Sequence, residues 1–129
     1  MLHEHALAQV KQASRVPTGF SGTWQNELGS TMTIAVSGTQ VTGTYDSAVS
    51  GGGGPAKGDL AGYVNGSLIS FVVEWQVAAI TAWVGHLVVE NGNAAIETLW
   101  QMTTSTNNPE DPKELWDAVF AGADRFVRV

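Results

Sequence analysis

Residues 19–36 are predicted to form two strands that share an apolar inner face, with polar side chains at the end of that face beside the connecting turn. A first strand is predicted to carry Asn26 inward, a tight turn follows at 27–29, and Ser30 begins a second strand on the same side. From Ser30 to Val36 apolar and polar residues alternate, so one face is apolar. An amide and a hydroxyl at the end of an apolar face are typical of a small-ligand pocket.

Four more polar side chains are predicted to face the same interior, because they share the parity of apolar neighbours on their strands. These are Tyr45, Ser47, Thr81 and, near the last strand, Asp124. Burying such groups without partners costs about 1–3 kcal/mol each. They therefore either bond one another or receive a polar ligand.

Three tryptophans add aromatic surface to this interior. Trp75, Trp83 and Trp100 have inward parity on three consecutive predicted strands. A core filled with indole rings explains them without a ligand, whereas a cavity walled by indoles also explains the polar groups. An eight-stranded barrel is just wide enough to hold one small molecule.

Period-two alternation runs from Gly19 almost to the end of the chain. The two-residue turn signals Ser37-Gly38, Asn65-Gly66 and Asn91-Gly92 separate runs rich in Val, Thr, Ile, Tyr and Trp. Strands are predicted at 20–27, 30–37, 40–47, 58–65, 67–76, 79–90, 93–104 and 120–128. Most connections suit only antiparallel neighbours, and closing the meander removes both sheet edges. The predicted fold is all-β, an eight-stranded antiparallel up-and-down (meander) β-barrel over residues 19–129, with a sandwich as the alternative.

Residues 1–18 are predicted to form an N-terminal tail that is flexible or contains a short helix. Apolar residues from Leu2 to Val10 have helical spacing, and Pro17 ends the segment. His3-Glu4-His5 matches no established metal motif, so no metal site is predicted. The segment also lacks the apolar stretch of a signal peptide.

Composition narrows the classes of function. The 129 residues include 12 acidic and 6 basic side chains, giving a net charge of -6. Such a surface disfavours nucleic acid and anionic membranes as partners. The absence of cysteine excludes disulfides, thiolate metal sites and a cysteine nucleophile.

A series of short motifs occurs in order between Gly19 and Val129: GTWQNELGS at 22–30, GTYDSAV at 43–49, TAWVG at 81–85, TLW at 98–100, Trp116, and GADRF at 122–126. Together they resemble the avidin and streptavidin family of biotin-binding proteins. The resemblance implies a non-catalytic protein that holds biotin, without a cofactor, in the mouth of a β-barrel.

The resemblance also implies roles for individual residues. Donors to the ureido oxygen of biotin are implied at Asn26, Ser30 and Tyr45, and acceptors for its N–H groups at Ser47 and Asp124. A contact with the sulfur is implied at Thr81. Walls around the bicyclic ring are implied at Trp75, Trp83 and Trp100, and apolar contacts at Leu28, Val49 and Met102.

The sequence departs from the family pattern between Trp75 and Ala79. The family usually has a polar loop here that ends in a serine near the ligand carboxylate, but Ala79 occupies that position. One lost hydrogen bond of about 1–1.5 kcal/mol weakens binding roughly tenfold. Ser50 and Gly51 remain candidates for the carboxylate, although their glycine-rich loop loses more entropy on closing.

Outward parity places several apolar residues on the outside of neighbouring strands, which indicates a covered surface: Val72, Ile80, Ala82, Val84, Val88 and Leu99. The resemblance implies a homo-oligomer, a tetramer with a dimer as the alternative, in which Trp116 reaches a neighbouring pocket. It further implies a secreted or periplasmic protein that sequesters the vitamin.

Two other functions remain as alternatives. A lipocalin-like carrier of another small cyclic ligand predicts fewer interior polar groups than this chain has. A small-barrel enzyme would need a general base such as Asp124 or Glu74 beside Tyr45. Glu74 has outward parity and no histidine has inward parity, so a catalytic dyad has little support.

Overall fold

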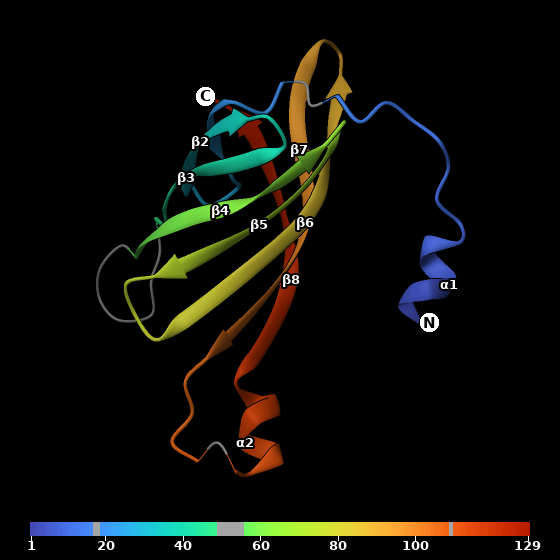
Figure 1. The fold of residues 1–129 in the computed structure, drawn as a ribbon. Helices are drawn as coiled ribbons and strands as arrows, with labels where there is room; N and C mark the ends of the chain where they lie inside the picture. Colours follow the sequence, from blue (N-terminus) through green and yellow to red (C-terminus); the bar gives the residue numbers. More distant parts are fainter. Residues whose placement is uncertain (17–18, 49–55, 109) are drawn as a thin grey trace.

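The computed structural model describes residues 1–16, 19–48, 56–108 and 110–129. The elements are α1 (His3–Leu7), β1 (Gly22–Gln25), β2 (Thr31–Ser37), β3 (Gln40–Asp46), β4 (Lys57–Asn65), β5 (Leu68–Trp75), β6 (Ala79–Glu90), β7 (Asn93–Thr104), α2 (Pro112–Asp117) and β8 (Val119–Arg128). The strands follow one another antiparallel around a closed ring, and β8 pairs with β1 (Figure 1). The predicted eight-stranded meander barrel is confirmed.

The connections at the two ends of the barrel differ in length. At one end, hereafter the closed end, two residues join each hairpin, at 38–39, 66–67 and 91–92. Gly38 and Gly66 both have φ of 61° at the first central position, where a type II′ turn needs glycine. The predicted turn signals therefore lie at the three hairpins. The opposite end, hereafter the open end, carries the longer connections 26–30, 47–56, 76–78 and 105–118.

Inward residues toward the closed end form a fully buried apolar core. Its members include Phe20, Trp24, Met32, Ile34, Val41, Leu60, Val64, Ile69, Phe71, Val73, Ile96 and Phe126. Trp24 has no exposed surface, and its indole N–H donates to the Phe20 carbonyl at 2.8 Å. The Arg128 guanidinium lies 4.3 Å from the centre of the Trp24 ring, a cation–π contact that covers it.

The seam between β1 and β8 closes the ring with few backbone contacts: Trp24 pairs with Arg128 and Gln25 with Val127, and the Val129 N–H donates to the Thr23 carbonyl at 3.0 Å. Side chains extend it in both directions. Arg128 donates to the carbonyl of Ser21 at 2.9 Å and also to that of Gly19. At the other side the Arg125 N–H donates to the Glu27 carboxylate at 2.7 Å, where a strand partner would otherwise lie.

The first strand ends at Gln25, two residues earlier than predicted. The reason is local, because the Asn26 side chain accepts hydrogen bonds from the N–H groups of Leu28 and Ser30 at 3.1 and 3.0 Å. A side chain that bonds its own following backbone favours a turn over a strand. The first strand also begins two residues later than predicted, at Gly22, and the bounds of the other seven strands lie within one residue of prediction.

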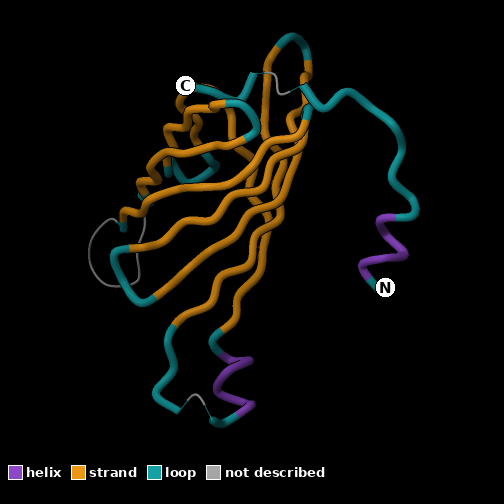
Figure 2. The backbone as a smooth tube through the Cα atoms, in the orientation of Figure 1, coloured by secondary structure: helices purple, strands orange, loops and turns teal. Residues whose placement is uncertain are grey.

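The N-terminal segment leaves the barrel at the closed end and runs away from it in both views of the backbone (Figures 1 and 2). Residues 1–16 are exposed. The segment is fixed at Arg15, whose carbonyl accepts from the Gly66 N–H at 3.0 Å and whose Nε donates to the Asn65 side chain at 3.3 Å. Within the described residues, neither helix has the length and apolarity to cross a bilayer.

Candidate ligand-binding site

The candidate site consists of the inward-facing side chains nearest the open end. Several of them keep partly exposed surface although they point into the barrel: Asn26, Ser47, Trp75, Ala79, Trp100, Met102 and Asp124. Deeper inward residues such as Trp24 and Phe126 have none. Solvent therefore enters the barrel interior from this end, where the predicted polar groups lie.

Asn26 presents its amide nitrogen to the interior. Its side-chain oxygen is occupied by the two backbone N–H groups of the β1–β2 turn, which orients the side chain. The nitrogen consequently points inward and donates to the Tyr45 hydroxyl over a long 3.4 Å. An asparagine held in this way is a fixed donor in the site.

Ser30 and Tyr45 present hydroxyl groups beside this amide. Ser30 is 5% exposed, and its oxygen accepts from the Ala48 N–H at 3.0 Å. Because that bond occupies an acceptor position, the Ser30 hydrogen is directed elsewhere, and it bonds to the Tyr45 oxygen. Tyr45 in turn accepts from its neighbours, which leaves its own hydrogen to donate. Three donors thus converge on one small region.

Asp124 faces these donors from β8. The Trp83 indole N–H donates to its Oδ2 atom at 3.1 Å, and Asn26 also bonds to its carboxylate. Thr98, opposite on β7, donates to the Asp124 backbone carbonyl at 2.9 Å and holds the residue in place. A carboxylate has about four lone-pair positions, so Asp124 retains acceptor capacity for a ligand.

Burial and nearby negative charge raise the pKa of both acidic groups of the cluster, Tyr45 and Asp124. Burial, followed by the nearby Asp124 charge, raises the pKa of Tyr45 far above its ordinary range, so the phenol remains a donor. Burial also raises the pKa of Asp124, while its hydrogen bond from Trp83 opposes this shift. An N–H donor from a ligand would favour the ionised form of Asp124 further.

Thr81 provides another directed hydroxyl, on β6. It is 3% exposed, and its oxygen accepts from the Trp75 indole N–H at 2.9 Å. Within the described residues its hydrogen has no acceptor. Since a buried hydroxyl hydrogen without an acceptor is unfavourable, Thr81 is prepared to bond a ligand atom.

Aromatic rings line one side of this polar cluster. Trp83 stacks between Tyr45 and Phe71, with ring centres 5.2 and 5.0 Å apart and interplanar angles of 24° and 15°. Trp75 meets the Tyr45 ring edge-on at 5.3 Å. Trp100 lies against Gly122, where a Cβ atom would come within 2.6 Å of the indole. Trp83 is thus packed into the core, whereas Trp75 and Trp100 keep partly exposed surface.

The remaining predicted residues occupy the rim or lie beyond the described chain. Ser47 is half-buried just after β3, and its N–H donates to the Ala56 carbonyl at 2.8 Å. Leu28 is 72% exposed on the β1–β2 turn, and Trp116 is 76% exposed on α2. Ala79 and Met102 lie on facing parts of β6 and β7 near the lip. The predicted residues Val49, Ser50 and Gly51 fall outside the described residues.

The sequence did not predict a role in the site for three residues that the structure places there. Glu27 contributes negative charge that raises the pKa of Asp124 and ties the β1–β2 turn to β8. Phe71 backs Trp83, and Thr98 positions Asp124. The alternation on their strands placed Phe71 and Thr98 inward, but only the register of β7 with β8 reveals the Thr98 contact.

Comparisons with known proteins identify relatives of this chain. The model of the avidin family matches residues 14–129. Avidin of Gallus gallus is 31% identical over 120 residues, which cover 84% of this chain and 77% of that protein. Avidin-related protein 4/5 of the same organism is 30% identical over 118 residues, with the same coverage.

Solved structures show the same barrel. The rhizavidin–biotin complex superposes with a TM-score of 0.73 at 32% identity, covering 90% of this chain and 97% of that one. The AVR2 structure gives a TM-score of 0.77 at 26% identity, covering 91% and 98% of the respective chains. Fold and site together define a small-ligand-binding up-and-down barrel. The chain belongs to the avidin family.

Proposed function

We propose that this protein binds biotin non-covalently and catalyses no reaction on it. The observation that carries the proposal is the polar cluster itself: Asn26, Ser30 and Tyr45 supply hydrogens that bond within the cluster in the free protein, and Asp124 faces them as an acceptor. A cyclic urea has the complementary arrangement, a carbonyl oxygen flanked by N–H groups. Rhizavidin, 32% identical over 90% of this chain, has been solved in complex with biotin.

Each part of the biotin head has a proposed partner. The ureido oxygen replaces both the long Asn26–Tyr45 bond and the Ser30–Tyr45 bond, and it receives all three donors. The two ureido N–H groups donate to Asp124 and Ser47, and the bond to the carboxylate is charge-assisted. The Thr81 hydrogen is directed to the sulfur, and the ring lies between Trp75 and Trp100 with Trp83 behind them.

The absence of catalysis is proposed from the same contacts. The Asp124 carboxylate is already bonded by Trp83 and Asn26, which suits holding a ligand more than removing a proton. All three histidines, the commonest acid–base side chains, are exposed. Glu74 is exposed on the outside of β5.

Titration calorimetry with biotin tests the proposal through a matched pair of variants. Tyr45→Phe removes one donor without changing the shape, and we expect binding about tenfold weaker. Asp124→Asn removes the charged acceptor, and we expect a loss of about 10- to 100-fold. Tyr63→Phe is the control, because Tyr63 is 63% exposed on the outer face. Equal affinity of all three variants and the parent, or no binding of biotin to the parent, would contradict the proposal.

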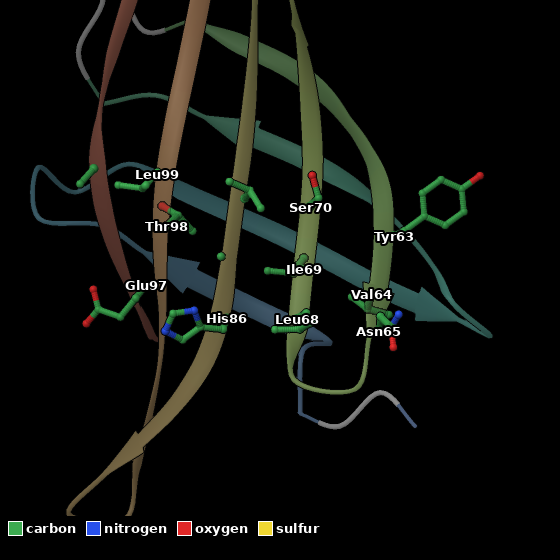
Figure 3. A pocket seen from close by; sticks show the side chains of 13 residues that line it. Tyr63, Val64, Asn65, Leu68, Ile69, Ser70, His86, Glu97, Thr98 and Leu99 are labelled. Atoms are coloured by element: carbon green, nitrogen blue, oxygen red, sulfur yellow. The ribbon is translucent and has the colours of Figure 1, made fainter. Parts of the chain in front are cut away.

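We further propose that the protein assembles as a homo-oligomer. A groove of about 670 Å³ runs along the outer face of β4–β7, away from the polar cluster (Figure 3). Leu68, Val84 and Leu99 line it and are more than half exposed, which is unfavourable unless another surface covers them. A second copy covering this face, and the exposed Trp116 contributing to a neighbouring site, explain both features.

Sedimentation velocity tests the assembly. We expect a species larger than a monomer at micromolar concentration, and dissociation on Val84→Asp, which places a charge in the groove. Trp116→Ala should leave the assembly intact and weaken biotin binding. A monomeric parent protein that binds biotin normally would refute the assembly while leaving the binding proposal in place.

A further inference from the structure

The polar cluster of the candidate site lies across the seam that closes the barrel. Its donors Asn26 and Ser30 belong to the β1–β2 turn, whereas its acceptor Asp124 belongs to β8. Strand β1 ends at Gln25, which pairs with Val127, so the ladder between β1 and β8 ends before it reaches Asp124. The separation between donors and acceptor therefore depends on contacts other than strand pairing.

Glu27 joins the two sides of the seam beyond the end of this ladder. Its Oε1 atom accepts a hydrogen bond from the Arg125 N–H at 2.7 Å. Glu27 directly follows Asn26 in the chain. On the other side of the seam, Arg125 directly follows Asp124. One bond thus connects the neighbours of two residues that have to act on the same ligand, and its carboxylate acceptor makes it stronger than a neutral bond.

Hydrogen bonds within the β1–β2 turn hold its shape but not its position. The Asn26 side chain accepts from the N–H groups of Leu28 and Ser30 at 3.1 and 3.0 Å. The Asn26 backbone N–H donates to the Ser30 carbonyl at 2.9 Å. All of these bonds lie between residues 26 and 30, so they make the turn a unit without tying it to β8.

The direct bond between Asn26 and Asp124 competes with the ligand. In the proposed complex the Asn26 amide donates to the ureido oxygen and Asp124 accepts from a ureido N–H, so the ligand uses both partners of this bond. Glu27 is exposed and is not among the residues proposed to touch biotin. Its bond to Arg125 involves neither of the ligand-binding groups, so we expect this bond to persist when the ligand is present.

The Glu27 carboxylate also acts on the charge of Asp124. Burial is the main cause of the raised pKa of Asp124, and the nearby Glu27 charge raises it further. Hydrogen bonds from Trp83 and Asn26 act in the opposite direction. Tyr45 faces Asp124 from β3 as a neutral phenol, because burial raises its own pKa far above the ordinary range. A neutral acceptor in place of Glu27 should therefore lower the pKa of Asp124.

We propose that Glu27 is a positioning residue for ligand binding: its bond to the Arg125 N–H fixes the distance between the donors of the β1–β2 turn and the Asp124 carboxylate. This inference rests on the proposed function. A turn that moves against β8 loses part of the preorganisation of the site, so binding must then supply the free energy of ordering it. The barrel keeps its seam without Glu27, because the strand pairs and Arg128 join β8 to β1 and to the residues before it.

Competition calorimetry with biotin tests the proposal on two variants of the same residue. Glu27→Ala removes the bond to the Arg125 N–H, and we expect biotin to bind about tenfold more weakly. Glu27→Gln keeps an oxygen acceptor in the same place and should recover most of this loss. Thermal unfolding without biotin should show that both variants are folded.

The pH dependence of binding separates positioning beside Asp124 from a general loss of structure. The ionised Asp124 accepts from the ligand, so biotin affinity falls as pH is lowered through the pKa of this residue. Without the Glu27 charge that pKa is lower, and we expect the fall in affinity to occur at lower pH in Glu27→Gln than in the parent protein. A general loss of structure would weaken binding without moving the profile. This readout needs only the Gln variant, so it also decides the matter if Glu27→Ala does not fold.

Glu90→Gln is the matched control. Glu90 pairs with the Arg125 guanidinium at 3.3 Å, so this variant removes a carboxylate partner of the same arginine and leaves the bond to its backbone N–H in place. We expect neither the biotin affinity nor its pH profile to change.

The outcomes separate this inference from the proposed function. Parent-like affinity of Glu27→Ala, or an unshifted pH profile of Glu27→Gln, overturns the positioning role while the biotin-binding proposal stands. The positioning role is also overturned if Glu90→Gln changes binding as much as the Glu27 variants do. A parent protein that binds no biotin contradicts the proposed function, and this inference fails with it.

Discussion

The closed and open ends of this barrel use the same strands for different purposes. At the closed end two-residue turns join the strands, and the interior is filled by apolar side chains such as Trp24 and Met32, which are at most 1% exposed. At the open end the connections are longer, and the interior is lined by buried hydroxyl groups, such as those of Ser30 and Thr81, and by the partly exposed Asn26 amide and Asp124 carboxylate. Apolar packing stabilises the closed end. The open end instead keeps polar groups oriented and buries less apolar surface.

This difference between the ends shows how the hydrogen-bonding groups of the site are oriented. Asn26 accepts two bonds from backbone N–H groups, and one bond from a backbone or indole N–H orients each of three other residues, Ser30, Thr81 and Asp124. Preorganised donors and acceptors lose little freedom when a ligand arrives. The closed end provides the rigid frame that makes such orientation possible.

The largest expected effect on stability is that of removing the Trp24 side chain. Trp24→Ala takes away a fully buried indole, its bond to Phe20 and the surface under Arg128, so we expect a loss of about 3–5 kcal/mol in the free energy of unfolding. Trp100→Ala, at the open end, should cost less stability, because Trp100 is only half-buried, and should weaken biotin binding. Chemical denaturation and calorimetry measure both. Equal losses of stability would break the distinction between the ends.

A medium effect is expected from Gly66→Ala in a closed-end turn. Gly66 has φ of 61°, and an added Cβ would lie 2.3 Å from the Ser14 carbonyl oxygen. We expect a loss of about 1–2 kcal/mol in unfolding free energy and release of the N-terminal segment, detected as faster proteolysis near Arg15. Gly92→Ala is the control, since Gly92 has φ of 79° but nothing within 4 Å of the new Cβ. Faster proteolysis in both variants would show that turn strain alone frees the segment.

The smallest effect concerns pH at the open end. The folded pKa of Asp124 is raised, so its contribution to the stability of the free protein is present below the unfolded pKa and is lost as pH rises through the folded one. Ligand N–H groups favour the ionised form, so biotin affinity should fall as pH is lowered through the same pKa. Thermal unfolding and calorimetry between about pH 3 and pH 7 measure these opposite trends. Asp124→Asn should flatten both, and identical profiles for parent and variant would exclude Asp124 as their cause.

Much of the fold was predictable because its signals are local. Alternation along each strand fixed which residues face inward, and glycine-containing turn signals marked the hairpins. The interior polar set followed from the same parity, as Thr81 and Asp124 illustrate. The roles of these residues came from a family resemblance, which the family comparison confirms at the level of the family.

Other features were not predictable because they join distant residues or depend on side-chain bonds. The Glu27–Arg125 and Arg128–Ser21 contacts link opposite ends of the chain and leave no periodic signal. The early end of β1 depends on the two bonds that Asn26 accepts. The direction of the Thr81 hydrogen depends on the position of the Trp75 indole. Such properties require coordinates.

The short seam between β1 and β8 has a consequence for the order in which the chain folds. Seven of the eight strand junctions join neighbours in sequence, which can meet after closing only short loops. The last junction must bring together Glu27 and Arg125, which are 98 residues apart in sequence. Few backbone pairs stabilise it. Because the entropy lost in closing a loop grows with its length, we expect ring closure to be a late step of folding. Arg128 donates hydrogen bonds to the backbone just before the first strand, and it therefore stabilises the closed barrel relative to an open, curled sheet.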